Sequence, residues 1–313
     1  MSIRFVFVVY LLIISFSSHA KIYSWVDEKG VKHFSSYAKS TDAEEVQLEA
    51  PVSQWKKTEI KIIDEGFDLT ESERERIRRD VVAVYEFFDK KLYFDIYKTV
   101  PVSIKAFGDK QAYVEYIRNH KGISRQSKDN SHNTLGIYLP KFNEIVIYQQ
   151  KYRERSFSTI KHEVSHAITD TLTPFVPSWL NEGIAENMET IGFEKGGFSI
   201  GPHLINYNHM KKHKRESKLL PVKEFLSLTS KEWRKKNIRS GYVMQTQAGE
   251  LTRMLLSTDT GLNFISRLMH NYKRGDKTIA FYLVDDEYFG GTGMLESKWS
   301  LWVNRKQSDS IAL

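Results

Sequence analysis

The feature that most constrains this chain is a pair of histidines, His162 and His166, in the run His-Glu-Val-Ser-His. On an α-helix, side chains four residues apart lie on one face, so both imidazoles can reach a single metal ion. Glu163 would lie about 100° further round the helix, beside the imidazoles but not between them. A carboxylate in that place can accept a proton from a metal-held water. The pattern therefore predicts a helix with two metal ligands and a general base.

The residues around the pair favour a helix. Apolar side chains recur at steps of three and four residues and form a stripe beside the histidines. The members of this stripe are Phe157, Ile160, Val164, Ile168 and Leu172. Pro174 is expected to stop the helix, because proline has no backbone N–H and clashes with the preceding turn.

A third ligand is expected from Glu182, in the run PSWLNEGIAENMETIG, which also has a helical pattern. Ser178 is the predicted N-cap of this helix, and Gly192 is its predicted C-terminal cap residue. A helix packed on the first can bring a carboxylate to the open side of the histidine pair, and Gly183 is expected to allow the close approach. Two His and one Glu with a vacant fourth position are a catalytic rather than a structural zinc set. The sequence thus predicts one Zn²⁺, held by His162, His166 and Glu182.

The combination of HEVSH and WLNEGIAE resembles the gluzincin metallopeptidases, in particular the bacterial peptidase MA-like group, over residues 100–270. In that family the Glu of the Asn-Glu-Gly triplet is the third zinc ligand, which corresponds to Glu182. The resemblance also implies that an acidic residue one turn later hydrogen-bonds a ligand histidine and fixes its tautomer. Glu186 occupies that position. A tyrosine before a later helix is implied to stabilise the oxyanion, and Tyr242 is three positions early for it; plain helix entry at residues 240–242 is the alternative.

The resemblance implies a zinc-dependent peptidase in which Glu163 is the general base and a peptide or protein, such as a cell-envelope component, is the substrate. The Gly-x-Met-Glu-Asn stretch of related aminopeptidases does not precede His162, which favours an endopeptidase. One alternative is a catalytically inactive, zinc-containing binding protein of the envelope. Another is a structural protein in which the two histidines are coincidental.

The start of the chain predicts export. Residues 1–20 contain Arg4, an apolar run from Phe5 to Phe16, and small residues at Ser18 and Ala20, which is typical of a signal peptide cut after Ala20. The apolar run is short for a membrane-spanning helix, so an uncleaved anchor is the alternative. We expect a periplasmic or secreted protein of a Gram-negative bacterium, with no transmembrane anchor after cleavage. Since the chain has 0 Cys, disulfides and thiolate ligands are excluded.

Residues 21–50 are predicted to form a small β module that begins with a hairpin of residues 22–26 and 31–35, closed by Gly30. The module resembles the domain of unknown function 4124 of exported bacterial proteins. The residues that carry this resemblance are Tyr23, Trp25, Asp27, Gly30 and Phe34. Residues 36–58 are polar, and we place a linker at residues 51–58, which begin at Pro51.

Residues 59–313 are predicted to form an α+β, zincin-like domain, with a sheet-containing part at 59–173 and a mainly helical part at 174–313. Thr70 and Glu73 form a predicted capping box that opens a helix through Phe94, and residues 110–119 form another helix. Strands are expected at residues 102–107 and on both sides of Pro140–Asn143. The family resemblance implies that Gly136–Leu139 or Ile145–Tyr148 binds an extended substrate by strand addition. Burial of both strands in the sheet is the alternative.

Solvent-exposed charged runs are enough to explain the formal net charge of +7. The run ESERERIRRD is expected to be a solvated helix face, so we expect no nucleic-acid partner. Basic runs at Lys211–Arg215 and Arg234–Arg239 could face anionic polymers or lipid, although solubility also explains them. Three nearby histidines are expected on the solvated surface: His203, His209 and His213.

Overall fold

The computed structural model describes residues 22–26, 32–35, 44–46, 60–94, 102–173, 175–194 and 197–313. The chain divides into two compact units, Met1–Gln54 and Trp55–Leu313. The predicted signal peptide, the turn at Gly30, the linker and Pro174 lie outside the described residues. Within the described part, no helix is long and apolar enough to cross a membrane.

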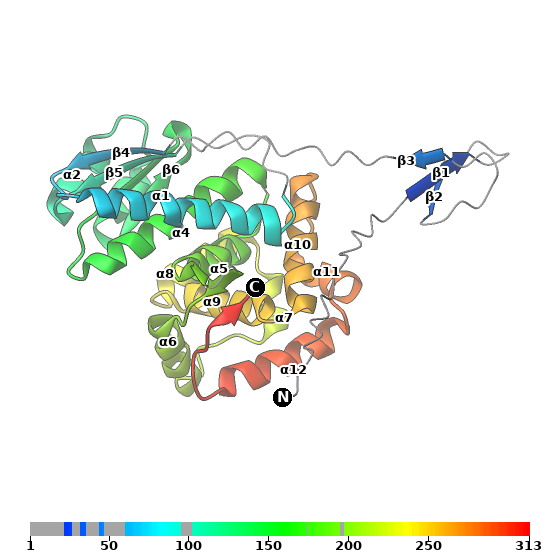
Figure 1. Ribbon diagram of the computed structural model, residues 1–313. Helices are drawn as coiled ribbons and strands as arrows, with labels where there is room; N and C mark the ends of the chain where they lie inside the picture. Colours follow the sequence, from blue (N-terminus) through cyan, green and yellow to red (C-terminus); the bar gives the residue numbers. More distant parts are fainter. Residues whose placement is uncertain are drawn as a thin grey trace, which may run out of the picture. The chain divides into compact units, whose positions relative to one another are not determined.

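The first unit contains three strands, β1 (Ile22–Val26), β2 (Lys32–Ser35) and β3 (Glu44–Val46), drawn as blue arrows in Figure 1. The predicted hairpin is confirmed, because β1 and β2 pair antiparallel with Tyr23 opposite Ser35. The third strand was not predicted. It pairs with the other edge of β1, and its sequence Glu-Glu-Val gives little strand signal, since glutamate is depleted in strands.

The second unit is organised around a four-stranded sheet with the order β4-β5-β7-β6. Its strands are β4 (Ile60–Glu65), β5 (Val102–Phe107), β6 (Gly136–Leu139) and β7 (Glu144–Tyr148). The first three in spatial order are parallel, and β6 is antiparallel to β7. The strands predicted around residues 136–148 are thus confirmed, with β6 at an edge and β7 inside the sheet.

Helices cover both faces of this sheet. Ile145 and Ile147 of β7 join the core formed with α1 (Glu71–Glu86) and α4 (Arg153–Leu172), whereas Val146 and Tyr148 pack with α2 (Lys110–Asn119). Figure 1 shows α1 and α4 side by side against the sheet. This alternation is what a strand buried on both faces requires, and it fixes α4 against β6 and β7.

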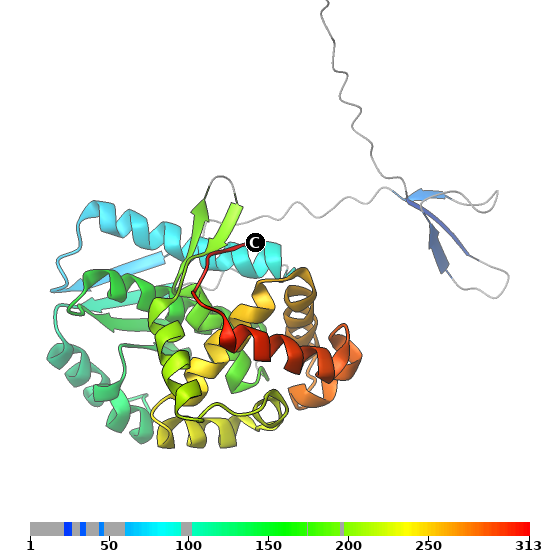
Figure 2. The same ribbon diagram turned by 90° about the horizontal axis from the view of Figure 1, so that it is seen from below.

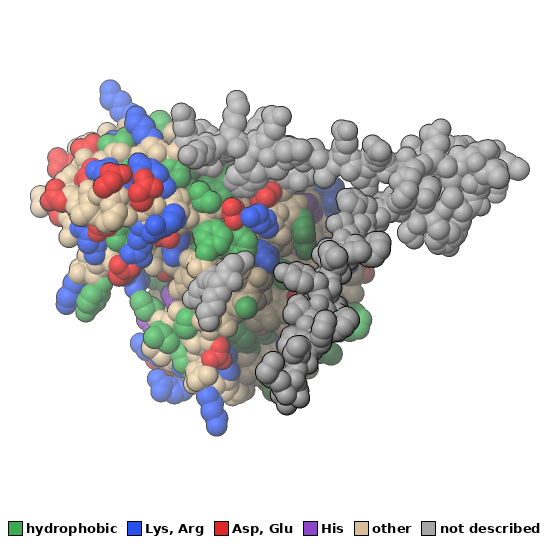
Figure 3. All heavy atoms as spheres, viewed as in Figure 1, with side chains coloured by type: hydrophobic (Ala, Val, Ile, Leu, Met, Phe, Trp, Pro, Cys, Tyr) green, Lys and Arg blue, Asp and Glu red, His purple; other side chains and the backbone are tan. Residues whose placement is uncertain are grey.

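Helix α1 begins at the predicted capping box. Thr70 Oγ1 accepts a hydrogen bond from Glu73 N at 3.3 Å, and Thr70 N donates to Glu73 Oε2 at 2.9 Å. The helix does not continue unchanged to Phe94, because its end widens into a π-helix at Phe87–Lys91. Its acidic and basic side chains are intermixed on the surface in Figure 3, as the charge pattern predicts for an exposed face.

The rest of the second unit is mainly helical, as predicted. After the short α3 (Arg125–Asn130), the helices beyond α4 are α5 (Ser178–Met188), α6 (Leu204–Arg215), α7 (Val222–Ser227), α8 (Ser230–Arg239), α9 (Val243–Leu256), α10 (Asp259–Lys273), α11 (Ala280–Glu287) and α12 (Gly291–Asn304). A hairpin after α5 is formed by β8 (Ile191–Glu194) and β9 (Gly197–Ile200), and β10 (Ile311–Ala312) adds to β9. Figure 2 shows this hairpin beside the C-terminal segment. The described chain is therefore a mixed α and β structure.

Both predicted caps of α5 are wrong. Ser178 is the first helical residue and Pro177 is the N-cap. Proline suits this place because its φ is fixed and it has no backbone N–H that would need a partner. The helix ends at Met188, so Gly192 lies in strand β8. The sheet that β8 joins overrides the local cap signal.

Gly183 allows a close approach, but the partner is α9 rather than α4. A Cβ at Gly183 would lie 2.1 Å from Thr252 Oγ1 and 2.8 Å from the Ala248 carbonyl oxygen. Asn187, one turn on, donates to the Gly183 and Gly249 carbonyls at 2.8 and 2.9 Å. These contacts seat α5 on α9 and so set which residues of α5 face α4.

Candidate metal centre

The two histidines lie on a helix that is buried on almost every side, between the sheet and α5. The apolar stripe of α4 packs into the main core, which leaves the histidine face toward α5. His162 and His166 project from that face, with their ring centroids 4.8 Å apart. The predicted placement of the pair is therefore present in the structure.

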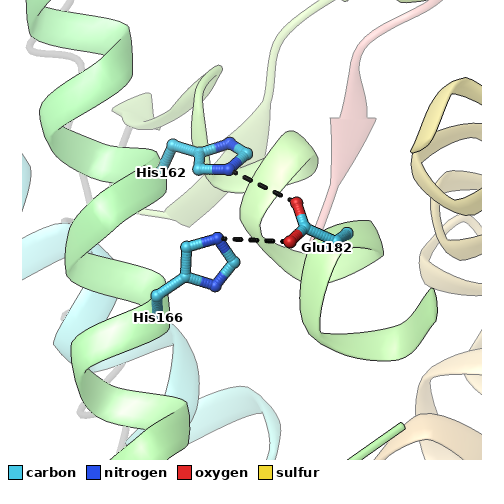
Figure 4. A group of neighbouring side chains, drawn as sticks. All are labelled: His162, His166 and Glu182. Carbon is cyan, nitrogen blue, oxygen red and sulfur yellow. Dashed lines mark ion pairs between the residues drawn. The ribbon is translucent and has the colours of Figure 1, made fainter. Parts of the chain in front are cut away.

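The carboxylate of Glu182 meets both imidazoles (Figure 4). Its Oε2 lies 3.7 Å from His162 Nε2, and its Oε1 lies 3.8 Å from His166 Nε2. In a tetrahedral zinc site with bonds of about 2.0–2.1 Å, neighbouring ligand atoms are about 3.4 Å apart. The spacing of these three side chains therefore fits one small cation held between them.

The outer nitrogen of each imidazole has an acceptor. His162 Nδ1 lies 3.0 Å from Glu189 Oε1, and His166 Nδ1 lies 3.1 Å from Asn181 Oδ1. Each Nδ1 therefore donates to its acceptor, which leaves Nε2 as the ring nitrogen directed to the Glu182 side. Despite burial, Glu182 and Glu189 raise the pKa of His162, so this cluster favours positive charge between the two imidazoles and the carboxylate. This donor set suits a divalent metal ion such as Zn²⁺.

The acidic partner of His162 is Glu189 and not Glu186, which corrects the predicted assignment. Glu186 accepts a hydrogen bond from Gln245 Nε2 at 2.7 Å, and its Oε2 lies 3.6 Å from His203 Nε2. Because α5 crosses α4, the side chain at its C-terminal end, rather than one turn after Glu182, reaches His162 Nδ1.

His203 extends this network and is buried, contrary to the surface location predicted for it. Its Nδ1 accepts a hydrogen bond from the Asn206 backbone N–H at 3.2 Å, so its Nε2–H is the donor to Glu189 Oε2 at 3.3 Å. Burial alone would raise the pKa of Glu189, but the hydrogen bonds from His162 and His203 outweigh burial and lower it. His213 is also buried, whereas His209 is exposed on the cleft wall.

Glu163 lies next to His162, His166 and Glu182 and is only 8 % exposed. Burial raises the pKa of this carboxyl group, and the neighbouring His162 and His166 offset part of the rise. The backbone N–H of Tyr138, in the edge strand β6, donates a hydrogen bond to the carboxylate. This hydrogen bond links the predicted general base to the strand at the edge of the sheet.

These groups lie in one cleft with a volume of about 550 Å³. One wall is formed by residues 133–136 with α4, and the other by α5, α6 and the start of α9. Tyr242 is on this second wall, as the N-cap of α9 with a left-handed φ of 69°. Gln245, where the family pattern would place the tyrosine, is occupied by its hydrogen bond to Glu186.

Comparison with known proteins bears on the first unit. Residues 11–57 match the family model described as "Domain of unknown function (DUF4124)". This match confirms the resemblance predicted for the N-terminal module, and it does not include any residue of the metal centre. A search of curated proteins found no match to the chain.

Proposed function

We propose that this chain is an exported zinc-dependent peptidase of the gluzincin type that hydrolyses internal peptide bonds. The observation that carries the proposal is the convergence of His162 Nε2, His166 Nε2 and the Glu182 carboxylate, with both Nδ1 atoms already paired. Three protein ligands leave a fourth position for water or substrate, which is the arrangement of catalytic zinc sites.

The residues around the ligands suit hydrolysis. Bound zinc would supply a coordinated water of lowered pKa and would polarise the scissile carbonyl. Glu163 accepts the proton of the attacking water and later transfers it to the departing amine. The Tyr138 N–H holds the Glu163 carboxylate in place for both transfers. Tyr242, on the opposite wall, is the proposed donor to the developing oxyanion.

Of the two strands expected to bind an extended peptide, β6 supports that role. Strand β7 is paired on both sides, by β5 and β6, so its backbone is already satisfied. The Tyr138 N–H points to Glu163 rather than into the ladder, and in an antiparallel pair alternate residues point the same way. Gly136, two residues earlier, therefore presents its N–H and C=O to the cleft, where a substrate strand can pair with them.

The test compares the wild-type chain with Glu163→Gln and with Glu154→Gln, a control on the same helix whose side chain is 74 % exposed. Zinc content is measured by mass spectrometry of the metal, and cleavage by release of fluorescent fragments from labelled casein. We expect one zinc per chain in all three proteins. Loss of the general base should lower the rate about 10²–10⁴-fold in Glu163→Gln alone.

The other outcomes separate the alternatives. Equal cleavage by wild type and Glu163→Gln would eliminate the assignment of the base. Absence of zinc from the wild-type protein would reject the metal centre. Stoichiometric zinc and peptide binding without cleavage of any protein in a proteome-wide screen would support the zinc-containing binding protein instead.

A further inference from the structure

The cleft contains a cation for which the described residues provide no partner. Arg155 lines the cleft and is half-buried, yet its guanidinium forms no hydrogen bond or ion pair with any residue that the structure describes. Its neighbours differ. Arg153 is bound by Glu73 with a shortest distance of 2.5 Å, and Glu154 is bound by Arg76 at 2.6 Å. Arg155 is the cation at this end of α4 that is left for a ligand.

The local structure does not account for Arg155. It lies in the first turn of α4, where the helix dipole disfavours a positive side chain. Partial burial of an unpaired guanidinium is also unfavourable. A carboxylate is the natural partner, because its two oxygens match the fork of N–H donors. A peptide can offer a carboxylate from an Asp or Glu side chain or from its C-terminus.

The contacts between β6 and α4 give the direction of a bound peptide. A Cβ on Gly136 would lie 2.6 Å from Thr159 Cγ2, and Tyr138 N–H reaches Glu163, so β6 and α4 run in the same direction. Arg155 is one turn before Thr159, next to the start of β6. A peptide that pairs antiparallel to β6 runs opposite to α4. Its residues after the cleaved bond therefore lie toward Arg155.

The distance along the helix gives the position. Arg155 precedes His162 by seven residues, or about 10 Å along the axis. An extended peptide advances about 3.4 Å per residue, so this span corresponds to about three residues, less the reach of the arginine side chain. We propose that Arg155 makes the cleft selective for peptides with a carboxylate two or three residues after the cleaved bond. This inference rests on the proposed peptidase function.

The experiment digests a proteome-derived peptide mixture with the wild-type chain, Arg155→Gln and Arg79→Gln, and maps the cleavage sites by mass spectrometry. Arg79 is exposed on α1 outside the cleft, so its variant controls for the loss of one charge. The wild type and Arg79→Gln should favour cleavage sites in which the second or third residue after the cleaved bond is Asp, Glu or the C-terminal residue of the peptide. In Arg155→Gln the ratio of cleavage at these sites to cleavage at other sites should fall about tenfold, which corresponds to the loss of one charge-assisted hydrogen bond.

A second digest of the same peptides with amidated C-termini distinguishes the two sources of the carboxylate. A preference that survives amidation comes from side chains, and one that disappears comes from the C-terminus. Cleavage by the wild type without any such preference, or with a preference that Arg155→Gln retains, would overturn the inference and leave the peptidase function intact.

A binding measurement keeps the inference testable if the wild type cleaves nothing, which would refute the proposed function. Zinc-loaded Glu163→Gln protein is titrated with labelled Gly-Ala-Ser decapeptides that carry one Asp or one Asn at successive positions. If the Asp peptides bind more tightly than the Asn peptides, and the double variant Glu163→Gln with Arg155→Gln removes this difference, Arg155 is supported as the carboxylate site. Equal affinity for the Asp and Asn peptides would rule it out.

Discussion

At the scale of single residues, Glu189 determines which nitrogen of His162 is free to bind a metal ion. Its Oε1 accepts from His162 Nδ1, and its Oε2 accepts from His203 Nε2. Partners of this kind fix the ring orientation and make the metal-binding nitrogen more basic, and their loss commonly weakens metal affinity about 10–100-fold. Metal binding at this cluster would therefore depend on a residue outside the three converging side chains.

We expect Glu189→Gln to weaken zinc binding within that range, because a neutral amide oxygen is a poorer acceptor for the imidazole N–H. The affinity is measured by competition with a fluorescent zinc chelator. Glu186→Gln is the matched control, since Glu186 contacts Gln245 and His203 but forms no hydrogen bond with a ligand histidine. Equal losses in the two variants would contradict the role assigned to Glu189.

The convergence of His162, His166 and Glu182 could be predicted from the sequence, but the partners of the outer imidazole nitrogens could not. His162 and His166 follow from helix periodicity alone, and Glu182 follows from a second helix close behind in the chain. The choice between Glu186 and Glu189 depends on the angle at which α5 crosses α4, which no local pattern contains. His203 is distant in sequence, and its only local signal is that it caps α6.

At the scale of elements, the position of Glu182 depends on how closely α5 approaches α9. Gly183→Ala would place a methyl group 2.1 Å from Thr252 Oγ1 and 2.8 Å from the Ala248 carbonyl oxygen. The backbone oxygen cannot move aside, so the helices must separate. We expect a loss of about 2 kcal/mol in the free energy of unfolding, typical of overpacking, together with weaker zinc binding.

The control for this substitution is Gly293→Ala in α12, where an added Cβ meets no atom within 4 Å. Alanine favours a helix interior over glycine by about 1 kcal/mol, so this variant should be at least as stable as the wild type. Thermal unfolding followed by circular dichroism compares the two. If Gly183→Ala were as stable as Gly293→Ala, the close approach of α5 and α9 would be wrong.

Elements with a strong local signal were predicted correctly, and those formed by distant contacts were not. The capping box at Thr70 and the strands around Pro140 each follow from nearby residues. The end of α5 is different, because β8 takes up residues that would otherwise cap the helix. Strand β3 is likewise created by pairing with β1 rather than by its own composition.

At the scale of the whole second unit, a charged contact joins the start of α4 to the segment that follows β4, the strand at the far edge of the sheet from β6. Arg153, at the start of α4, donates to Glu73 of α1 and to the carbonyl oxygens of Phe67 and Asp68. The hydrogen bond from Arg153 lowers the pKa of Glu73 from 4.5 to about 2. This contact holds together residues that are far apart in sequence but adjacent in the fold.

Because the pKa of Glu73 is lower in the folded protein than its ordinary value, its stabilising effect is complete above pH 4.5 and is lost as the pH falls toward about 2. Glu73→Gln keeps a side chain suited to the capping box but removes the charge. We expect it to reduce the free energy of unfolding by about 1 kcal/mol at pH 7, the value for a partly exposed ionic contact. Near pH 2 the difference from the wild type should vanish.

Glu232→Gln is the matched control, because Glu232 forms the same capping box with Thr229 but has no arginine partner among the described residues. Urea unfolding of all three proteins, followed by circular dichroism at pH 7, 4 and 2.5, measures the differences at constant metal content. Both variants remove the carboxylate at the N3 position of a capping box. The extra decrease in the free energy of unfolding of Glu73→Gln therefore measures the contact with Arg153. A difference between Glu73→Gln and wild type that stayed constant across this range would show that Glu73 stabilises the fold through the cap rather than through its charge.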